Sequence, residues 1–306
     1  MAVISRSIPR TQARTIGGKQ IGQIARSIVM VLGLGFFTAW TVFPLLWIVM
    51  TSFKTNKEIY QQATFLPTTF TLQHYDHILN KTRFLTYLKN SLMVSTLTTI
   101  AAMLIGVLAA YAISRLNFRG RTFMARTTIV TYLVPGSLVF IPLYQIAYQL
   151  HLTNKAIGLV VIYLVGTVPF CTWLAISYFN TIPYELEEAA LIDGATRVQA
   201  LTRIVLPLAL PALAVIALYA FTQSWNEFLF ALLLIGRDSQ KTIPSGLAGL
   251  INGDTFQWGA LMAGALISSI PPILIYIAAQ RWVVSGLAGG AVKGSSRCQV
   301  SDVRYQ

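Results

Sequence analysis

Residues 188–207 read EAALIDGATRVQALTRIVLP, a mostly polar stretch that separates two long apolar segments. Pro183 suits the first turn of a helix, because the N–H that proline lacks has no partner there. Glu187 and Glu188 then place negative charge near the positive N-terminal end of that helix. Gly194 can adopt the positive φ that ends a helix and turns the chain sharply. The stretch is therefore predicted as a short helix, a tight turn and a second helix.

Seven positions in this stretch define a pattern: Glu188, Ala189, Ala190, Gly194, Ile204, Leu206 and Pro207. At average residue usage, such a pattern matches by chance about once in 10⁸ starting positions. The two alanines leave a low surface that a partner can approach closely. An amphipathic surface helix without a partner would not require glycine and Leu-Pro at these offsets. The pattern therefore favours a docking loop over an ordinary surface helix.

The composition is that of an integral membrane protein. Of 306 residues, 55% are hydrophobic and 11% are charged, and the mean hydropathy is +0.63. Soluble domains carry about 25% charged residues. The formal net charge of +13 raises the question of nucleic-acid binding. The basic residues cluster beside apolar segments instead of forming one continuous face, so we expect no nucleic-acid partner.

Six segments are long enough to cross about 30 Å of hydrocarbon as helices. They are Ser27–Thr51, Leu85–Ile113, Thr127–Leu150, Ala156–Phe179, Leu208–Ile235 and Gly259–Gln280. Prolines within or at the ends of these segments permit kinks. They are Pro135, Pro169, Pro211, Pro271 and Pro272. We expect an all-α membrane protein with six transmembrane helices.

The distribution of basic residues predicts the orientation. Fifteen Lys and Arg residues lie on the side of the two termini and the 188–207 stretch, against eight on the other side. The positive-inside rule places the more basic side, with both termini, in the cytoplasm. The opposite side carries two long loops, 54–84 and 236–258. Both are long enough to contact an extracytoplasmic partner or to serve as passive connectors.

Residues 1–26 form a basic, polar arm before the first apolar segment, and 295–306 form a C-terminal tail. The first apolar segment is too long for a signal-peptide core and lacks a small-residue cleavage site, so we expect it to remain in the membrane. We expect the arm to be mobile and cytoplasmic, where it can lie on anionic lipid.

One group of polar residues falls inside the fifth segment, and helical spacing places it on a single stripe: Tyr219, Thr222, Gln223, Asn226 and Glu227. With Trp225 as a further aromatic surface, the predicted path-lining residues are Tyr219, Gln223, Trp225, Asn226 and Glu227. Glu227 is the only carboxylate within an apolar segment, and such groups are costly in hydrocarbon. A sugar-like solute requires hydrogen-bonding groups and an aromatic surface, which this stripe offers. A structural hydrogen bond or ion pair between helices explains Glu227 equally well.

Motifs for catalysis and for metal binding are missing from the sequence. It contains no phosphate-binding loop, no HExxH and no GxSxG, so we do not expect the chain to hydrolyse ATP by the usual route, and any energy from ATP must come from another polypeptide. Two cysteines, Cys171 and Cys298, lack the spacing of a disulfide framework or metal site. His74 and His77 form too weak a pattern to predict a metal site.

From about residue 28 to 294 the chain resembles the permease subunits of type I ABC importers, and within them the maltose-type, carbohydrate-importing branch. The pattern at 188–207 is the EAA motif of this family. The run SWNEF at 224–228 and the ending QRWVVSGL at 280–287, followed by GGAVKG at 289–294, point to the sugar branch.

The resemblance implies the type I permease fold at 27–294, in the inner membrane of a bacterium or archaeon. It implies a heterodimer with a second permease, two ATPase subunits that bind ATP-Mg, and an extracytoplasmic solute-binding protein. No cofactor is implied for this chain. The EAA loop, about 180–207, would dock into the ATPase and carry its movement to the spans. The implied coupling residues are Glu188, Ala189, Ala190, Asp193, Gly194, Ile204, Leu206 and Pro207.

Two alternatives remain at this point. A secondary transporter driven by an ion gradient also explains six spans and a buried carboxylate, although it would typically show inverted repeats and more intramembrane ionisable residues. A second alternative keeps the family but changes the solute to a peptide, an amino acid or phosphate. The polar stripe and the C-terminal ending favour a sugar.

Overall fold

A computed structural model of the chain describes residues 16–61, 64–252 and 255–292. The predicted tail at 295–306 and the first part of the predicted arm, residues 1–15, lie outside these ranges. The longest helices are α1 (Ile16–Ser52), α4 (Phe84–Arg115), α7 (Ala156–Phe179), α11 (Leu210–Asn226) and α14 (Trp258–Val292).

The shorter helices occupy the loops or continue a broken span. They are α2 (Asn56–Gln61), α3 (Gln73–Asn80), α5 (Arg121–Leu133), α6 (Gly136–Gln149), α8 (Glu185–Ile192), α9 (Arg197–Ala200), the π-helical turn η1 (Leu201–Val205), α10 (Leu206–Leu208), α12 (Leu229–Leu234), the 3₁₀ turn η2 (Asp238–Gln240) and α13 (Ile243–Ala248). Strands β1 (Ile251–Asn252) and β2 (Thr255–Phe256) pair antiparallel, with Ile251 opposite Phe256.

Four continuous helices within the described ranges are long and apolar enough to cross a membrane, and two bent helix pairs raise the number to six. The all-α prediction with six spans is therefore confirmed. The fourth predicted span has the bounds of α7, Ala156–Phe179. The first and last predicted spans match the span-forming parts of α1 and α14, Arg26–Ser52 and Trp258–Trp282. The helices themselves extend further, since α1 begins at Ile16 and α14 ends at Val292.

The third predicted span, Thr127–Leu150, is broken instead of continuous. Its two halves, α5 and α6, are bent by 99° at the break. Pro135 explains the break, because a residue before proline is pushed from helical into extended conformation. Val134 accordingly has a ψ of 119°.

The fifth predicted span, Leu208–Ile235, is interrupted twice. A bend of 81° separates α11 from the helical stretch Arg197–Leu208. At the other end of α11, Glu227 is extended with a ψ of 120°, and α12 follows. Glu227 therefore lies at a helix break and not on the continuous helical stripe that the spacing predicts.

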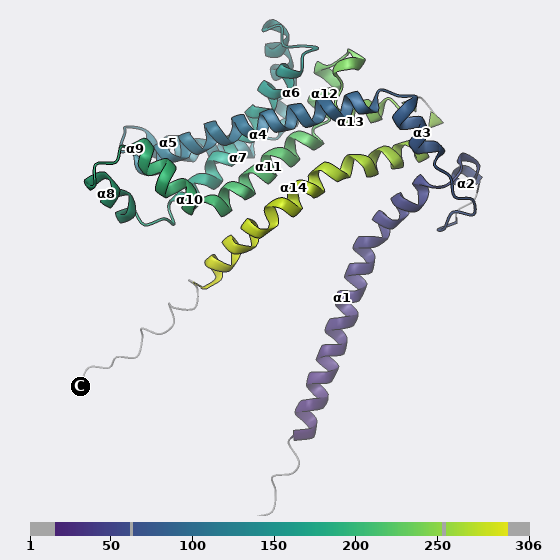
Figure 1. Ribbon diagram of the computed structural model, residues 1–306, viewed down its shortest axis with the longest axis horizontal. Coiled ribbons are helices and arrows are strands. Elements are labelled where there is room, and N and C mark those ends of the chain that lie inside the picture. Colours follow the sequence, from purple (N-terminus) through teal and green to yellow (C-terminus); the bar gives the residue numbers. More distant parts are fainter. Residues whose placement is uncertain (1–15, 62–63, 253–254, 293–306) are drawn as a thin grey trace, which may run out of the picture.

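The helices α4, α7 and α11 pack against one another, and α14 lies along α11 (Figure 1). The largest buried cluster lies among α4, α7, α11 and η1, with fully buried members such as Ala102, Phe179, Val205 and Ile216. Helices α8 and α9 lie at one end of this bundle, and α3 lies at the other (Figure 1). Helix α1 contacts α14 and then diverges from the bundle.

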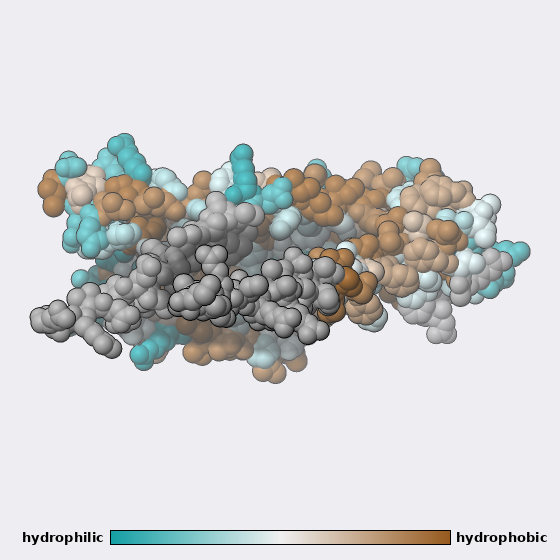
Figure 2. All heavy atoms as spheres, turned by 90° about the horizontal axis from the view of Figure 1, so that it is seen from below, coloured by the Kyte–Doolittle hydropathy of each residue, from teal (hydrophilic) through white to brown (hydrophobic). Residues whose placement is uncertain are grey.

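Apolar side chains cover much of the described surface (brown in Figure 2). In α1, Phe36 is 63% exposed and Trp40 is 72% exposed, and in α4 Leu104 is 60% exposed. An apolar surface of this extent suits contact with lipid tails or a partner helix, since both are as apolar as the side chains themselves.

Candidate functional site

The coupling loop, defined here as residues 180–207, folds as the sequence predicts around α8. Gly194 has a φ of 88°, which L-residues rarely adopt. The backbone N–H of Ala195 donates to the carbonyl of Ala190 at 2.9 Å, and that of Gly194 donates to Leu191 at 3.1 Å, so the glycine closes the helix end. Thr196 then caps α9, as the loop turns back toward the membrane.

The predicted coupling residues fall into two groups. On α8 and its turn, the side chains of Glu188, Ala189 and Asp193 and the backbone of Gly194 are exposed, and Ala190 is half-buried. Beside them Ile192, which the sequence analysis did not single out, is 85% exposed. The second group, Ile204, Leu206 and Pro207, lies on the returning helix.

Ile204 and Leu206 are half-buried, whereas Pro207 is exposed. Leu206 packs against the main core cluster that contains Leu201 and Val205. Leu206 and its buried neighbours therefore attach the loop to the bundle, and the exposed residues of α8 form a surface that a partner can reach.

Glu187 lies in the first turn of α8, as predicted, and has a further role that was not predicted. Its side chain is 2% exposed and lies in the protein interior. Its Oε2 lies 3.2 Å from Nε of Arg115 in α4, and its Oε1 accepts a hydrogen bond from the Tyr111 hydroxyl. Breaking one partner of a buried ion pair costs about 3–5 kcal/mol. This contact therefore anchors α8 to α4.

Sequence reasoning missed both partners of Glu187. The signal available was Arg115, a cation in the last turn of an apolar helix, four residues after Tyr111 on the same face. Its guanidinium also donates to the carbonyls of Phe179 and Ile182, each at 2.9 Å, where α7 ends. Arg115 thus joins three elements, α4, α7 and α8, at a single buried point.

A cavity of about 640 Å³, the central cavity, opens where the two broken spans meet. Its polar and aromatic lining residues are Thr131, Tyr132, Tyr163, Thr167, Tyr219, Gln223, Ser224, Asn226, Glu227, Phe228 and Phe230. Four of the five predicted path-lining residues are therefore together here. Non-helical backbone at membrane depth is tolerated where it lines such a cavity.

Glu227 occupies the break between α11 and α12. Both carboxylate oxygens lie 3.3 Å from the backbone nitrogen of Phe230, which donates to them. A carboxylate at this position also faces the positive end of α12. Glu227 therefore makes a local hydrogen bond at the start of α12 and also lines the central cavity.

Aromatic rings form one wall of the cavity. The ring centroids of Tyr219 and Phe170 are 3.8 Å apart, and those of Tyr132 and Phe170 are 5.0 Å apart. Gln223 donates from Nε2 to the Tyr219 hydroxyl at 3.2 Å. The Tyr163 hydroxyl is buried at the cavity and has no hydrogen-bond partner among the described residues. Sequence reasoning missed Tyr132 and Tyr163, because both lie in other segments than the predicted stripe.

Trp225 is the exception among the predicted path-lining residues. It is 4% exposed, stacks on Phe221 at 5.4 Å and belongs to a core cluster with Phe84. It is absent from the residues that line the central cavity. The prediction that it offers an aromatic surface to the path is wrong, because its helical position turns it toward the opposite side of α11.

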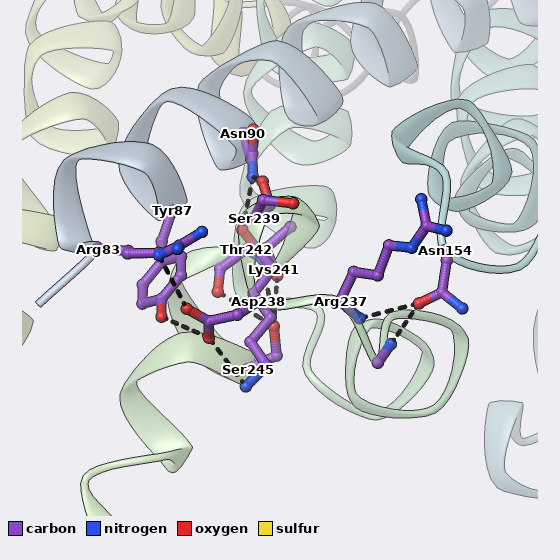
Figure 3. Close-up of polar contacts among 11 residues, drawn as sticks. Arg83, Tyr87, Asn90, Asn154, Arg237, Asp238, Ser239, Lys241, Thr242 and Ser245 are labelled. Atoms are coloured by element: carbon purple, nitrogen blue, oxygen red, sulfur yellow. Dashed lines mark hydrogen bonds and ion pairs between the residues drawn. The ribbon is translucent and has the colours of Figure 1, made fainter.

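At the α3 end of the bundle, Asp238 is the centre of a polar cluster (Figure 3). The Tyr87 hydroxyl donates to its Oδ1 at 2.7 Å, and Nζ of Lys241 and Nε of Arg83 lie 3.2 and 3.6 Å from its oxygens. The hydrogen bond from Tyr87 lowers the pKa of Asp238 below its ordinary value, and Lys241 acts in the same direction.

Asn90 and Ser91, near the start of α4, bind this same loop. Asn90 donates to the carbonyls of Ser239 at 3.0 Å and Lys241 at 2.9 Å. Ser91 accepts from the backbone N–H of Ile243 at 2.8 Å. Their partners are loop backbone and the start of α13, instead of another transmembrane helix.

The histidines do not form a metal site. Within the described ranges no group of three or more His, Cys, Asp or Glu side chains is placed to hold a metal. His74 is buried in α3, with Nε2 2.8 Å from the carbonyl oxygen of Lys54. Burial lowers the pKa of its imidazole. Gly259 packs so closely on this ring that a Cβ there would lie 2.1 Å from Nε2.

Comparison with known proteins identifies the family. Residues 102–289 match the family described as binding-protein-dependent transport system inner membrane component. The chain belongs to this family. Membership and the span-forming helices make it a multi-pass membrane permease, and they exclude the ion-coupled secondary transporter.

Two curated relatives and one solved structure agree with this assignment. The inner membrane ABC transporter permease protein YcjP of Escherichia coli is 38% identical over 86% of this chain and 95% of its own length. The trehalose/maltose transport system permease protein MalG of Thermococcus litoralis is 34% identical over 89% of this chain and 99% of its own. A bacterial ABC transporter involved in the import of the acidic polysaccharide alginate has a chain with a TM-score of 0.73 at 25% identity, covering 89% of this chain and 99% of that one.

Proposed function

We propose that this chain is one of the two permease subunits of an ATP-driven importer of a carbohydrate, and that α8 docks into an ATPase subunit. The observation that carries the proposal is the exposed surface of α8. Ile192 is 85% exposed beside the exposed Glu188, Ala189 and Asp193, although the helix itself is anchored by a buried ion pair. A rigidly held helix with an exposed apolar tip suits docking into a partner protein.

The proposed orientation follows from the basic residues. Counted by the predicted spans, fifteen of the 23 Lys and Arg residues fall on the side of α8 and of both termini. The positive-inside rule places this side in the cytoplasm, where ATPase subunits reside. The loops at 54–84 and 236–258 then face the solute-binding protein on the other side.

The partners supply what this chain lacks. Its sequence has no phosphate-binding loop, so we assign ATP and Mg²⁺ to two separate ATPase subunits and no cofactor to this chain. Movement of the ATPase shifts the permease between its two states only if α8 binds the ATPase differently in each, because equal binding changes no population. A second permease completes the path.

The central cavity supports a carbohydrate as the solute. Sugars present hydroxyls to hydrogen-bonding groups and apolar ring faces to aromatic side chains. Gln223, Asn226 and Glu227 offer the former, and Tyr132 and Tyr219 offer the latter. The volume of about 640 Å³ lies in the range of small-molecule sites. The named cargoes of the relatives, trehalose or maltose and alginate, are also saccharides.

The test is purification of this subunit from its native membrane in mild detergent, followed by an ATPase assay on what co-purifies. We expect an ATPase whose rate rises when a sugar-loaded binding protein is added. An ATPase stimulated only by a peptide-, amino-acid- or phosphate-loaded binding protein would overturn the carbohydrate assignment. Recovery of the chain without any ATPase would overturn the docking role of α8.

A further inference from the structure

Helix α4 contacts both the coupling loop and the loop at the opposite end of the bundle. It runs from Phe84 to Arg115 without a proline, and at 1.5 Å per residue it is about 48 Å long. Sharp kinks arise mostly at proline or at irregular turns, and α4 has neither. It also packs tightly on α7, since a Cβ on Gly106 would lie 3.1 Å from Cβ of Cys171. Displacement of one end of α4 therefore moves the other.

At the α8 end, the attachment is buried. Arg115 and Tyr111 hold the carboxylate of Glu187, whose neighbour in sequence is the exposed Glu188. The Arg115 and Glu187 side chains are only 6% and 2% exposed, so water cannot replace the ion pair when α8 is pushed. Helix α8 therefore cannot move away from α4 without leaving two buried charges uncompensated.

At the other end, α4 holds the loop between α12 and α13. Tyr87 donates to Asp238, and Asn90 donates to two carbonyls of the loop (Figure 3). Ser91 accepts from the first amide of α13. Tyr87 also fits against Gly246, where a Cβ would lie 2.2 Å from its ring. This loop begins directly after α12, and Leu229 and Phe230 of α12 line the central cavity.

We propose that α4 transmits the movement of α8 across the membrane to the α12–α13 loop and so sets the wall of the central cavity that α12 forms. Tyr111 and Arg115 are the positioning residues at the α8 end, and Tyr87, Asn90 and Asp238 are those at the other. The inference rests on the proposed function, because the movement begins at the ATPase.

The first experiment uses the complete complex, with its ATPase subunits and binding protein, reconstituted in liposomes. The quantity measured is the number of solute molecules imported per ATP hydrolysed. We expect Glu187→Gln to keep the ATPase bound and to lower this ratio at least fivefold. The matched control is Ser114→Ala, because the Ser114 hydroxyl bonds only carbonyls of its own helix, Ala110 and Tyr111. An unchanged ratio in Glu187→Gln would overturn the inference.

The second experiment combines Glu187→Gln with Asp238→Asn, which weakens the far attachment. If α4 connects the two sites, the double variant imports no less per ATP than the worse single variant, because the connection is already lost. Distant and independent sites would instead multiply their effects. Multiplied effects in this pair would overturn the inference.

The control for the second experiment is a substitution of Asn154, which holds the same loop from another element. The Asn154 side chain accepts from the amides of Gly236 and Arg237, at 2.7 and 2.9 Å, and lies between α6 and α7 (Figure 3). Asn154→Gly suits the φ of 56° at this position and removes the acceptor. Its effect should multiply with that of Glu187→Gln.

Two further outcomes are distinguishable. If Glu187→Gln fails to assemble, Tyr111→Phe takes its place, because it removes one hydrogen bond to the same carboxylate. Tyr111→Phe is then combined with Asp238→Asn. A double variant no worse than the worse single variant supports the inference, and multiplied effects overturn it. If the unmodified complex shows no ATP-dependent import, the proposed function itself is wrong and the inference fails with it.

Discussion

The coupling loop and the central cavity are built in opposite ways. The outward-facing residues of the coupling loop, such as Glu188 and Ile192, are neighbours within one eight-residue helix. The polar residues of the cavity come from α5, α7 and α11, as Tyr132, Tyr163 and Gln223 show. The coupling loop therefore appears in the sequence as a contiguous motif, whereas the cavity exists only after two helices break and meet.

This difference follows from what each region contacts. A docking surface is exposed, so its residues can be chosen without regard to packing, and one helix is sufficient. A path through the membrane must place polar groups inside the bundle, where each group also needs a partner or a cavity. Substitutions should accordingly act through backbone conformation in the coupling loop and through single polar atoms in the cavity.

The largest effect is expected from Gly194→Pro in the coupling loop. Proline requires a φ near −65°, whereas Gly194 has 88° and donates its N–H to Leu191. We expect ATP-driven uptake to fall by more than about tenfold, with membrane insertion largely intact. The measurement is uptake into membrane vesicles at equal protein levels.

Gly194→Asn is the matched control, because asparagine tolerates the left-handed conformation. We expect it to keep most of the uptake. Normal ATP-driven uptake by the Gly194→Pro complex would contradict the proposed difference between the coupling loop and the central cavity, because the backbone conformation of the turn would then not matter.

In the central cavity, Glu227→Ala should reduce uptake by about tenfold while the complex still assembles, since removal of one charge-assisted hydrogen bond costs about 1.5–3 kcal/mol. The variant removes both the acceptor for the Phe230 amide and the carboxylate that faces the cavity. Recovery of the complex in detergent is measured beside uptake. Thr222→Ala is the control, because the Thr222 hydroxyl bonds the carbonyl of Leu218 in its own helix. Equal losses of assembly and uptake would leave Glu227 with a structural role only.

A smaller effect is expected from Tyr163→Phe. The variant removes a buried hydroxyl that lacks a partner among the described residues, so the stability of the complex should be equal or higher. If the solute supplies the missing partner, KM for import should rise about fivefold, because a neutral hydrogen bond contributes about 1 kcal/mol. An unchanged KM, with unchanged stability, would remove Tyr163 from the solute-contacting residues.

The smallest effect concerns pH and separates the fold from the cavity. Burial lowers the pKa of His74, so the folded protein binds fewer protons here than the unfolded chain, whose histidine titrates near 6.5. Stability is therefore full above pH 6.5 and is lost as the pH falls from there toward the folded-state pKa. We expect Tm to decrease by a few degrees, about 2–4 °C per kcal/mol, between pH 7 and pH 5.

His74→Gln should flatten this decrease, whereas the exposed His151→Gln should leave it in place. The comparison of regions becomes sharper in this way, because any loss of transport in acid that persists in His74→Gln can be assigned to the cavity. A decrease in Tm that is identical in all three proteins would rule out His74 as its cause.

The sequence predicted the coupling loop more completely than the central cavity. For the coupling loop it located α8, the turn at Gly194 and the returning helix, because capping and turn preferences are local. It missed the burial of Glu187, which depends on Arg115, 72 positions earlier in the chain. For the cavity it located Tyr219, Gln223, Asn226 and Glu227 but assigned Trp225 to the wrong side of α11.

The amino-acid order alone was sufficient for the membrane location, the number of spans, the all-α class and the EAA motif, because hydropathy, helix length and local turn chemistry depend on neighbours in the chain. Tertiary packing decided which helices break, which carboxylate is buried and which side chains share the cavity. Pro135 permits a break in the third span, but the 99° bend helps to form the central cavity only because a second broken span meets it there. Contacts between distant segments have no local signal, so only the folded bundle shows them.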